Sequence, residues 1–277
     1  MARDFFRCLF CVGNLMISSA QNPKIKLVRA LMGRSRERRQ AGAFVAEGVR
    51  LVEEALTAGW TFKFVLYDET LSERGRLLVH RLQAAQVDVE LVSASLMNSL
   101  GETETPQGIL AVLALPRLEV VPPGLDFVLI LDQIRDPGNL GTLLRTAAAA
   151  GVQAVFLSPE TADAFAPKVV RAGMGAHFCL PILALSWEQI RQACEQAGLQ
   201  VWLADMDGIS CWQADLKRPL GLIIGGEADG PSPSAQALAH DTISIPMPGG
   251  TESLNAAVAG AVLMFEVVRQ EMTRENR

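Results

Sequence analysis

The second half of the chain alternates short apolar segments with helical patterns, and this alternation restricts the folds available to it. Apolar runs predict strands at Phe127–Leu131, Val152–Leu157, Leu199–Ala204, Leu220–Ile224 and Thr242–Ile245. Helices are expected between and after them, at Leu140–Ala150, Trp187–Ala197, Ser234–Ala239 and from Ser253 to about Met272. Strands that alternate with helices predict an α/β fold with a mostly parallel sheet that is covered on both faces.

A smaller α/β pattern occupies the first half of the chain. A basic helical stretch from Lys24 precedes a predicted short strand at Phe44–Gly48, and the last strand of this part is expected at Gly108–Leu115. The size of this pattern, about 100 residues, is typical of a separate domain.

These patterns predict two domains joined by a linker rich in Pro and Gly. We expect an N-terminal α/β/α domain over residues 16–115, the linker over 116–124 and the second domain over 125–277. Residues 1–15 are interpreted as an extension upstream of the native start. A chain that begins at Met16 is therefore expected to be as stable and as active.

The charge of the chain is unevenly distributed. The total of 25 basic and 30 acidic residues, a net charge of −5, disfavours a nucleic-acid partner when it is taken alone. Residues 1–50, however, carry ten basic and three acidic residues (+7), whereas the other 227 residues carry 15 basic and 27 acidic ones (−12). The basic run over residues 34–39 is open to two interpretations, a solvated helix end or a surface that contacts phosphates.

The cysteines and histidines disfavour several kinds of site. Cys8 and Cys11 form a C-x-x-C without a second Cys/His pair at zinc-finger spacing, so we expect no metal site. The three histidines lie far apart and provide no Ser-His-Asp pattern. Five scattered cysteines favour a reducing cytoplasm over a disulfide framework. Since no apolar run reaches the ~18 residues of a membrane span, no membrane association is expected.

Ligands of parallel sheets bind beside the carboxyl ends of the strands, so the loops that follow the strands are informative. After the first strand of the second domain, Asn139 is expected to cap the next helix, and Gly141 allows another backbone to come close. Arg145, followed by Thr146, lies about one turn further along. By itself this pattern is also that of a capped helix with one surface arginine.

Two further strand ends have unusual compositions. The strand that ends at Ile224 is followed by a loop with Gly225, Gly226 and Glu227, which lacks the G-x-G-x-x-G order of a dinucleotide-binding turn. The loop after the last strand contains Pro246, which donates no backbone hydrogen bond, and it ends with two candidate helix caps, Ser253 and Asn255. Helix capping alone does not explain why the loops after three strands all have unusual compositions.

Together the three segments resemble the motifs of the SpoU (TrmH-like) family of RNA ribose 2′-O-methyltransferases, within the SPOUT class. The resemblance covers residues 124–272, and the motifs occur in the family's order. The matching residues are Asn139, Gly141, Arg145 and Thr146, then Gly226, Glu227 and Gly230, then Ile245, Pro246, Met247, Gly249, Ser253, Leu254, Asn255 and Ala259. The resemblance implies a trefoil knot in the C-terminal domain and a homodimer.

The resemblance also implies S-adenosylmethionine as the cofactor and a set of catalytic residues. The cofactor would be bound by Gly225, Ile245 and Leu254, with Gly226 and Met247 nearby. The catalytic set would be Arg145, Asn139, Glu227, Ser253 and Asn255. The resemblance gives Arg145 the role of making the ribose hydroxyl nucleophilic. Because a guanidinium stays protonated at neutral pH, we expect Arg145 to bind the adjacent phosphate and to stabilise the developing alkoxide. Action of Arg145 as a base is the alternative that the sequence leaves open.

The N-terminal domain is similar to the substrate-binding domain of many SpoU enzymes, which is related to kink-turn-binding ribosomal proteins. The similarity lies in Asn22-Pro23, Phe44-Val45, Glu47-Gly48 and Thr105-Pro106-Gln107-Gly108. It implies an RNA partner, with ribosomal RNA favoured over transfer RNA. The expected RNA-binding residues are Lys24, Lys26, Arg34, Arg36, Arg38, Arg39 and Arg171.

One residue departs from the family pattern. Gly173 stands where many relatives carry serine, two residues after Arg171, and we expect it to loosen this loop.

Three alternatives remain open from the sequence. They are a transfer RNA methyltransferase of the same fold, a non-catalytic RNA-binding assembly protein, and a nucleotide-dependent enzyme that uses the Gly225 turn. Binding of S-adenosylmethionine or of NAD would separate the last alternative from the others.

Overall fold

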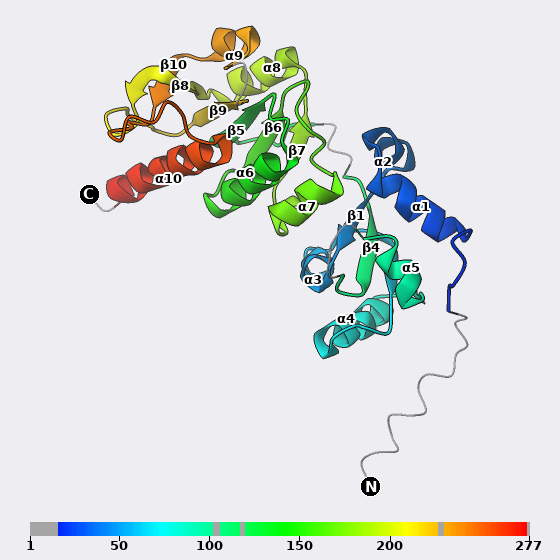
Figure 1. Ribbon diagram of the computed structural model, residues 1–277. Coiled ribbons are helices and arrows are strands. Elements are labelled where there is room, and N and C mark those ends of the chain that lie inside the picture. Colours follow the sequence, from blue (N-terminus) through cyan, green and yellow to red (C-terminus); the bar gives the residue numbers. More distant parts are fainter. Residues whose placement is uncertain (1–15, 102–105, 117–119, 227–229, 276–277) are drawn as a thin grey trace. The chain divides into compact units, whose positions relative to one another are not determined.

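A computed structural model describes residues 16–275 of the 277-residue chain, except for 102–105, 117–119 and 227–229. The chain divides into two compact units, residues 1–115 and 116–277 (Figure 1). Within the described ranges, no helix is long and apolar enough to cross a membrane.

The N-terminal unit is built on a mixed sheet with the strand order β1-β4-β2-β3, in which only β2 and β3 pair in parallel. Its elements are α1 (Pro23–Met32), α2 (Ser35–Ala41), β1 (Ala43–Glu47), α3 (Val49–Thr57), β2 (Phe62–Tyr67), α4 (Glu73–Ala84), β3 (Val89–Leu91), α5 (Ala94–Asn98) and β4 (Ile109–Ala114).

Helices cover both faces of this sheet. Ile25 and Val28 of α1 and Leu96 of α5 belong to one buried cluster with Val45 and Leu110 of the strands. On the other face α3 packs against β1, β4 and the neighbouring α4. The α/β/α arrangement predicted for this domain is therefore confirmed.

The C-terminal unit is built on a sheet whose described strands are all parallel, in the order β10-β8-β9-β5-β6-β7. Its elements are β5 (Phe127–Asp132), α6 (Pro137–Ala149), β6 (Ala154–Leu157), α7 (Pro167–Gly173), the 3-10 turn η2 (Ala176–Phe178), β7 (Ile182–Ala184), α8 (Trp187–Ala197), β8 (Gln200–Ser210), β9 (Leu220–Gly225), α9 (Pro233–Leu238), β10 (Asp241–Ser244) and α10 (Ala256–Glu275).

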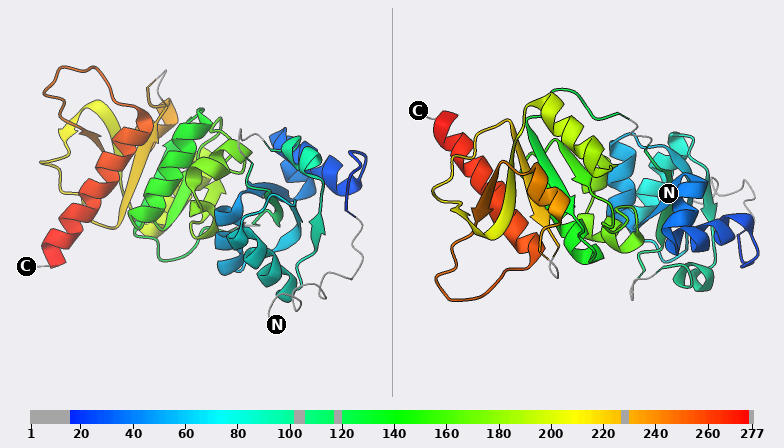
Figure 2. Two further views of the ribbon diagram at one scale, coloured as in Figure 1. Left: turned by 60° about the horizontal axis from the view of Figure 1, so that its bottom comes forward. Right: turned by 90° about the horizontal axis from the view of Figure 1, so that it is seen from above.

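Alternate side chains of β5 point to opposite faces of the sheet and belong to two different buried clusters. Leu129 and Leu131 belong to one buried cluster with Leu143 of α6 and Met264 of α10. Figure 2 shows the helices and the sheet of this unit from two further sides. Ile130, which points the other way, belongs to the cluster of α8 and α9. Because a strand covered on both faces buries every side chain, the apolar runs of the sequence predicted these strands correctly.

Several predicted boundaries were wrong. α7 and β7 were not predicted, since elements of seven and three residues are too short to show a period. β8 continues to Ser210, because it pairs with β10 again at Ile209 and Ile243 after a register shift. α10 begins at Ala256 rather than at Ser253. The strand order does not test the trefoil knot, which stays a prediction.

Candidate active site

A cavity of about 510 Å³ lies at the carboxyl ends of β9 and β10 and beside the middle of β8. Its size is within the range of small-molecule sites. All five residues predicted to bind the cofactor line it, together with Ser253 and Asn255 of the predicted catalytic set; these cofactor residues are Gly225, Gly226, Ile245, Met247 and Leu254.

The lining combines apolar walls with a few polar groups. Ile224, Ile243 and Leu263 supply apolar surface, while Asp205 and Glu252 supply carboxylates. Such a lining fits S-adenosylmethionine, which has a planar adenine and positive charge on its sulfonium and amino groups. The structure thus gives the predicted cofactor residues a cavity with matching chemistry.

The sequence analysis missed one wall of this cavity, formed by Ala204, Asp205 and Met206. The predicted strand ended at Ala204, whereas β8 continues to Ser210, so all three residues belong to the strand. The rule that ligands bind at the carboxyl ends of parallel strands could have pointed to Asp205 and Met206, because they follow the predicted end of a strand that pairs in parallel with β9.

Asn255 connects the third motif with the first. Its Nδ2 donates a hydrogen bond to Oδ1 of Asn139 over 2.9 Å, although 116 residues separate them. Its Oδ1 accepts hydrogen bonds from the backbone of Ala257 at 3.0 Å and of Val258 at 3.3 Å, so the same side chain caps α10. One side chain therefore both caps α10 and contacts a residue of the first motif.

The predicted cap of α6 was wrong. The N-cap is Asp136, whose Oδ1 accepts a hydrogen bond from the backbone N–H of Asn139 at 2.8 Å. Asn139 thus sits in the first turn of the helix, which leaves its side chain available to Asn255.

Asp132 at the end of β5 binds the backbone of Ser232, which follows the glycine-rich loop, and the sequence did not indicate this contact. Asp132 is 1% exposed, and its Oδ2 accepts a hydrogen bond from the backbone N–H of Ser232 at 2.7 Å. Next to it Gly226 approaches Gln133 so closely that a Cβ would lie 2.8 Å from the Gln133 carbonyl oxygen. The ends of β5 and β9 are therefore locked together beside the cavity.

Two further residues of the predicted catalytic set, Arg145 and Glu227, and the predicted RNA ligand Arg171 lie outside this cavity lining or outside the described residues. Arg145 is exposed on α6 and lies outside the lining of the cavity. Glu227 lies outside the described residues. Arg171 is half-buried on α7, the helix that packs directly on α6 at Gly141, where a Cβ would be 2.4 Å from that of Ala172.

Two of the predicted RNA-binding residues are engaged inside their own domain. Arg38 is 3% exposed, and its Nη1 donates hydrogen bonds to the carbonyl oxygens of Leu31 at 2.7 Å and of Gly33 at 3.0 Å, at the end of α1. Lys24 forms ion pairs with Asp88 and Glu90. The side chains predicted for RNA contact that stay exposed are Lys26, Arg34, Arg36 and Arg39.

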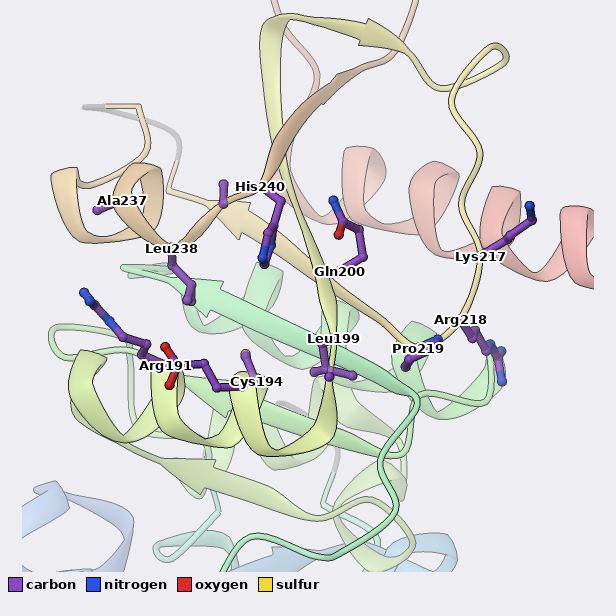
Figure 3. A pocket seen from close by; sticks show the side chains of 13 residues that line it. Arg191, Cys194, Leu199, Gln200, Lys217, Arg218, Pro219, Ala237, Leu238 and His240 are labelled. Carbon is purple, nitrogen blue, oxygen red and sulfur yellow. The ribbon is translucent and has the colours of Figure 1, made fainter.

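A second cavity, of about 650 Å³, lies at the amino ends of β8 and β9, where it is lined by residues such as Arg191, Arg218 and His240 (Figure 3). His240 Nδ1 accepts a hydrogen bond from the backbone of Val201 at 3.0 Å. Burial, with the nearby charge of Glu195, raises the pKa of the Cys194 thiol to about 12, so this cysteine is no thiolate nucleophile at neutral pH. The predicted cofactor residues line the first cavity instead.

The comparisons with known proteins agree with this geometry. Residues 126–265 match the SpoU rRNA Methylase family, and residues 22–111 match the MRM3-like substrate binding domain. The chain is 34% identical to the 23S rRNA (guanosine(2553)-2′-O)-methyltransferase of Bacillus subtilis, over 91% of this chain and 98% of that protein. It is 31% identical to the 23S rRNA (uridine(2479)-2′-O)-methyltransferase of Streptomyces viridochromogenes, over 92% of each chain.

Solved structures show the same likeness. The SpoU methyltransferase AviRb from Streptomyces viridochromogenes, in complex with AdoMet, superposes with a TM-score of 0.82 at 31% identity, over 91% of this chain and 99% of that one. An rRNA methyltransferase from Sinorhizobium meliloti gives a TM-score of 0.82 at 30% identity, over 93% and 98% of the two chains. The predicted family, fold class and cofactor are confirmed. The chain therefore belongs to the SpoU rRNA methylase family and is an S-adenosylmethionine-dependent RNA 2′-O-methyltransferase.

Proposed function

We propose that the protein methylates a ribose 2′-hydroxyl of 23S ribosomal RNA. The observation that carries this proposal is the hydrogen bond between Asn255 and Asn139, which joins the cofactor cavity to the helix of Arg145. The choice of 23S ribosomal RNA is supported by the names of the relatives from Bacillus subtilis and Streptomyces viridochromogenes. The predicted cytoplasmic location stays a prediction.

The residues have distinct roles in this proposal. S-adenosylmethionine supplies an activated methyl group, so the protein has to position the ribose hydroxyl and to stabilise the charge that develops on it. Arg145, exposed on α6, binds the adjacent phosphate and stabilises the alkoxide. Asn139 and Asn255 orient α6 relative to the cavity, and Ser253 and Glu227 complete the predicted set.

Methyl transfer to ribosomal RNA tests this function directly. Labelled S-adenosylmethionine is incubated with 23S ribosomal RNA and transfer RNA transcripts and with wild-type protein, Arg145→Ala or Arg191→Ala. Arg191 is a matched control, because it is an exposed arginine on another helix of the same unit. We expect transfer to 23S ribosomal RNA, abolished in Arg145→Ala and unchanged in Arg191→Ala, with cofactor affinity preserved in both variants.

Two other outcomes would contradict the proposal. Transfer to transfer RNA alone would favour the alternative enzyme of the same fold. Binding of RNA without transfer to either RNA would favour the non-catalytic assembly protein.

We assign RNA binding in the N-terminal unit to the exposed members of the basic segment. Lys26 lies on α1, Arg34 precedes α2, and Arg36 and Arg39 lie on α2. Arg38 and Lys24 are left out of this set, since their charged groups already form hydrogen bonds and ion pairs within the N-terminal unit. Electrostatic contacts with phosphates predict that affinity falls steeply with salt.

The predicted homodimer is supported by an apolar stripe on α10. Val258, Phe265 and Met272 recur every seven residues and are 49%, 48% and 59% exposed. Seven residues correspond to about two helical turns, so the three side chains lie along one side of the helix. Phe265→Glu should convert a dimer into a monomer in analytical ultracentrifugation. A monomeric wild-type protein would contradict this assignment.

A further inference from the structure

Gly173, the last residue of α7, has no room for a side chain. A Cβ at this position would lie 2.7 Å from Cε1 and 2.8 Å from Nδ1 of His177, distances that real Cβ atoms essentially never show. The left-handed backbone at this turn belongs instead to Met174, with a φ of 47°, and to Gly175, with a φ of 96°. The imidazole of His177, and not the backbone conformation, therefore accounts for glycine at position 173.

His177 connects the two ends of α7. It follows the helix in η2, is 2% exposed, and its Nε2 donates a hydrogen bond to the carbonyl oxygen of Ala164, 2.7 Å away and before the helix. Its ring also packs edge-on against Phe165, with 5.5 Å between the ring centroids. Since a carbonyl oxygen only accepts, the proton lies on Nε2, and Nδ1 is a bare nitrogen that faces Gly173.

The state of the imidazole agrees with this assignment. Nδ1 is buried without a hydrogen-bond partner among the described residues. Burial lowers the pKa of His177 to about 4, against the opposing effects of its bond to Ala164 and of the charge on Asp163. The ring is therefore neutral at physiological pH and acts as a rigid spacer.

The other side of Gly173 faces α6. A Cβ on Gly141 would lie 2.8 Å from the carbonyl oxygen of Val169 and 3.1 Å from the backbone nitrogen of Gly173. The backbone of α7 at Gly173 is thus packed between two neighbours without space for a side chain. These neighbours are the backbone of α6 at Gly141 and the ring of His177. Arg145 lies one turn beyond Gly141 on α6, and Arg171 lies two residues before Gly173 on α7.

We propose that His177 is a positioning residue for methyl transfer: its imidazole fixes α7 against α6 and so holds Arg171 in register with Arg145. This inference rests on the roles proposed for the two arginines in RNA binding and transfer. It replaces the expectation that Gly173 loosens this loop, because the space beside this glycine is filled.

A double-mutant cycle tests the steric part. Alanine in place of a helical glycine is ordinarily stabilising. We expect Gly173→Ala to lower the melting temperature in the wild-type background and to leave it unchanged or raise it in the His177→Ala background. Gly173→Ala that is equally stabilising in both backgrounds would overturn the contact.

Kinetics test the positioning part, with the variants His177→Gln and His177→Leu. A glutamine side chain carries an amide N–H near the place of the imidazole Nε2–H, whereas leucine fills similar volume without a donor. We expect His177→Leu to lower kcat/KM for 23S ribosomal RNA by tenfold to a hundredfold, as a displacement of about 1 Å does. The Kd of S-adenosylmethionine should stay within about twofold, and His177→Gln should restore most of the loss. His80→Gln, on the exposed surface of α4, is the control.

The outcomes separate this inference from the proposed function. Wild-type kcat/KM in His177→Leu, or equal losses in the leucine and glutamine variants, would overturn the positioning role. A parallel loss of cofactor affinity would do the same, because it indicates general disorder. If Arg145→Ala remains active, the proposed function fails whatever the variants of His177 show.

Discussion

The side-chain amide of Asn255 donates a hydrogen bond to the side-chain carbonyl of Asn139, and the two residues come from opposite ends of the catalytic unit. One partner lines the cavity that we propose for the cofactor, and the other lies in the first turn of the helix that carries Arg145. The bond therefore connects the proposed site of the methyl donor to the helix of the proposed phosphate ligand.

Substitutions of Asn255 can separate its two roles. Asn255→Ala should cost about 1 kcal/mol of stability, because it removes the cap of α10, and should lower methyl transfer. Asn255→Asp keeps a capping oxygen but loses the donor to Asn139, so it should preserve stability within about 0.5 kcal/mol and still lower kcat. Urea unfolding and methyl transfer measured on both variants check this. Full activity in Asn255→Asp would show that a donor at position 255 is dispensable.

Asp132 should control the cofactor cavity without lining it. Asp132→Ala leaves the backbone N–H of Ser232 without its buried acceptor, which should destabilise the unit by about 1–3 kcal/mol. Because Ser232 follows the glycine-rich loop, the affinity for S-adenosylmethionine should fall as well. Calorimetric titration at a temperature where the variant remains folded measures this effect. An unchanged Kd would mean that the loop keeps its shape without Asp132.

The buried His177 should make stability depend on pH. Its pKa is about 4 in the folded chain, against an ordinary value of 6.5 in the unfolded chain. As the pH falls, the unfolded chain therefore takes up a proton on His177 before the folded chain does, and this favours unfolding. The stability that the neutral imidazole contributes is complete above pH 6.5 and is lost as the pH falls toward 4. Between about pH 7 and pH 4.5 wild type should lose about 2–3 kcal/mol more than His177→Gln does. His80→Gln should follow wild type, and equal losses in all three proteins would refute the buried neutral imidazole.

Arg38 and Arg36 should differ although they are two residues apart. Arg38→Met removes a charged donor from the carbonyl groups at the end of α1 and should destabilise the N-terminal unit by about 2 kcal/mol. Arg36→Met, at an exposed position, should leave stability unchanged within about 0.5 kcal/mol but weaken RNA binding and reduce its salt dependence. Melting curves and binding titrations at two salt concentrations check both. If Arg38→Met keeps the stability of wild type but binds RNA poorly, then Arg38 contacts RNA and has no structural role.

Periodicity predicted the strands of the second domain, and the order of the motifs predicted which loops carry the candidate site. The strands of the second domain are apolar runs because helices cover them on both faces, and the three loops at their ends carry the family's residues. The five residues predicted to bind the cofactor indeed line one cavity.

Contacts between distant segments could not be predicted in this way. Asp136 and Asn139 are both good capping residues, and only the structure shows that Asp136 caps α6 while Asn139 meets Asn255. In the sequence Arg38 is one of several charges in a basic run, and only the structure shows that its side chain is buried by tertiary packing.

Mapping of the methylated nucleotide tests the central claim most directly. Ribosomal RNA is treated with the protein and S-adenosylmethionine and is then hydrolysed in alkali, which does not cleave after a 2′-O-methylated ribose. We predict one protected position in 23S ribosomal RNA, which appears with wild-type protein and is absent with Arg145→Ala. Methyl label on a base without alkaline protection, or protection that persists in Arg145→Ala, would contradict the account.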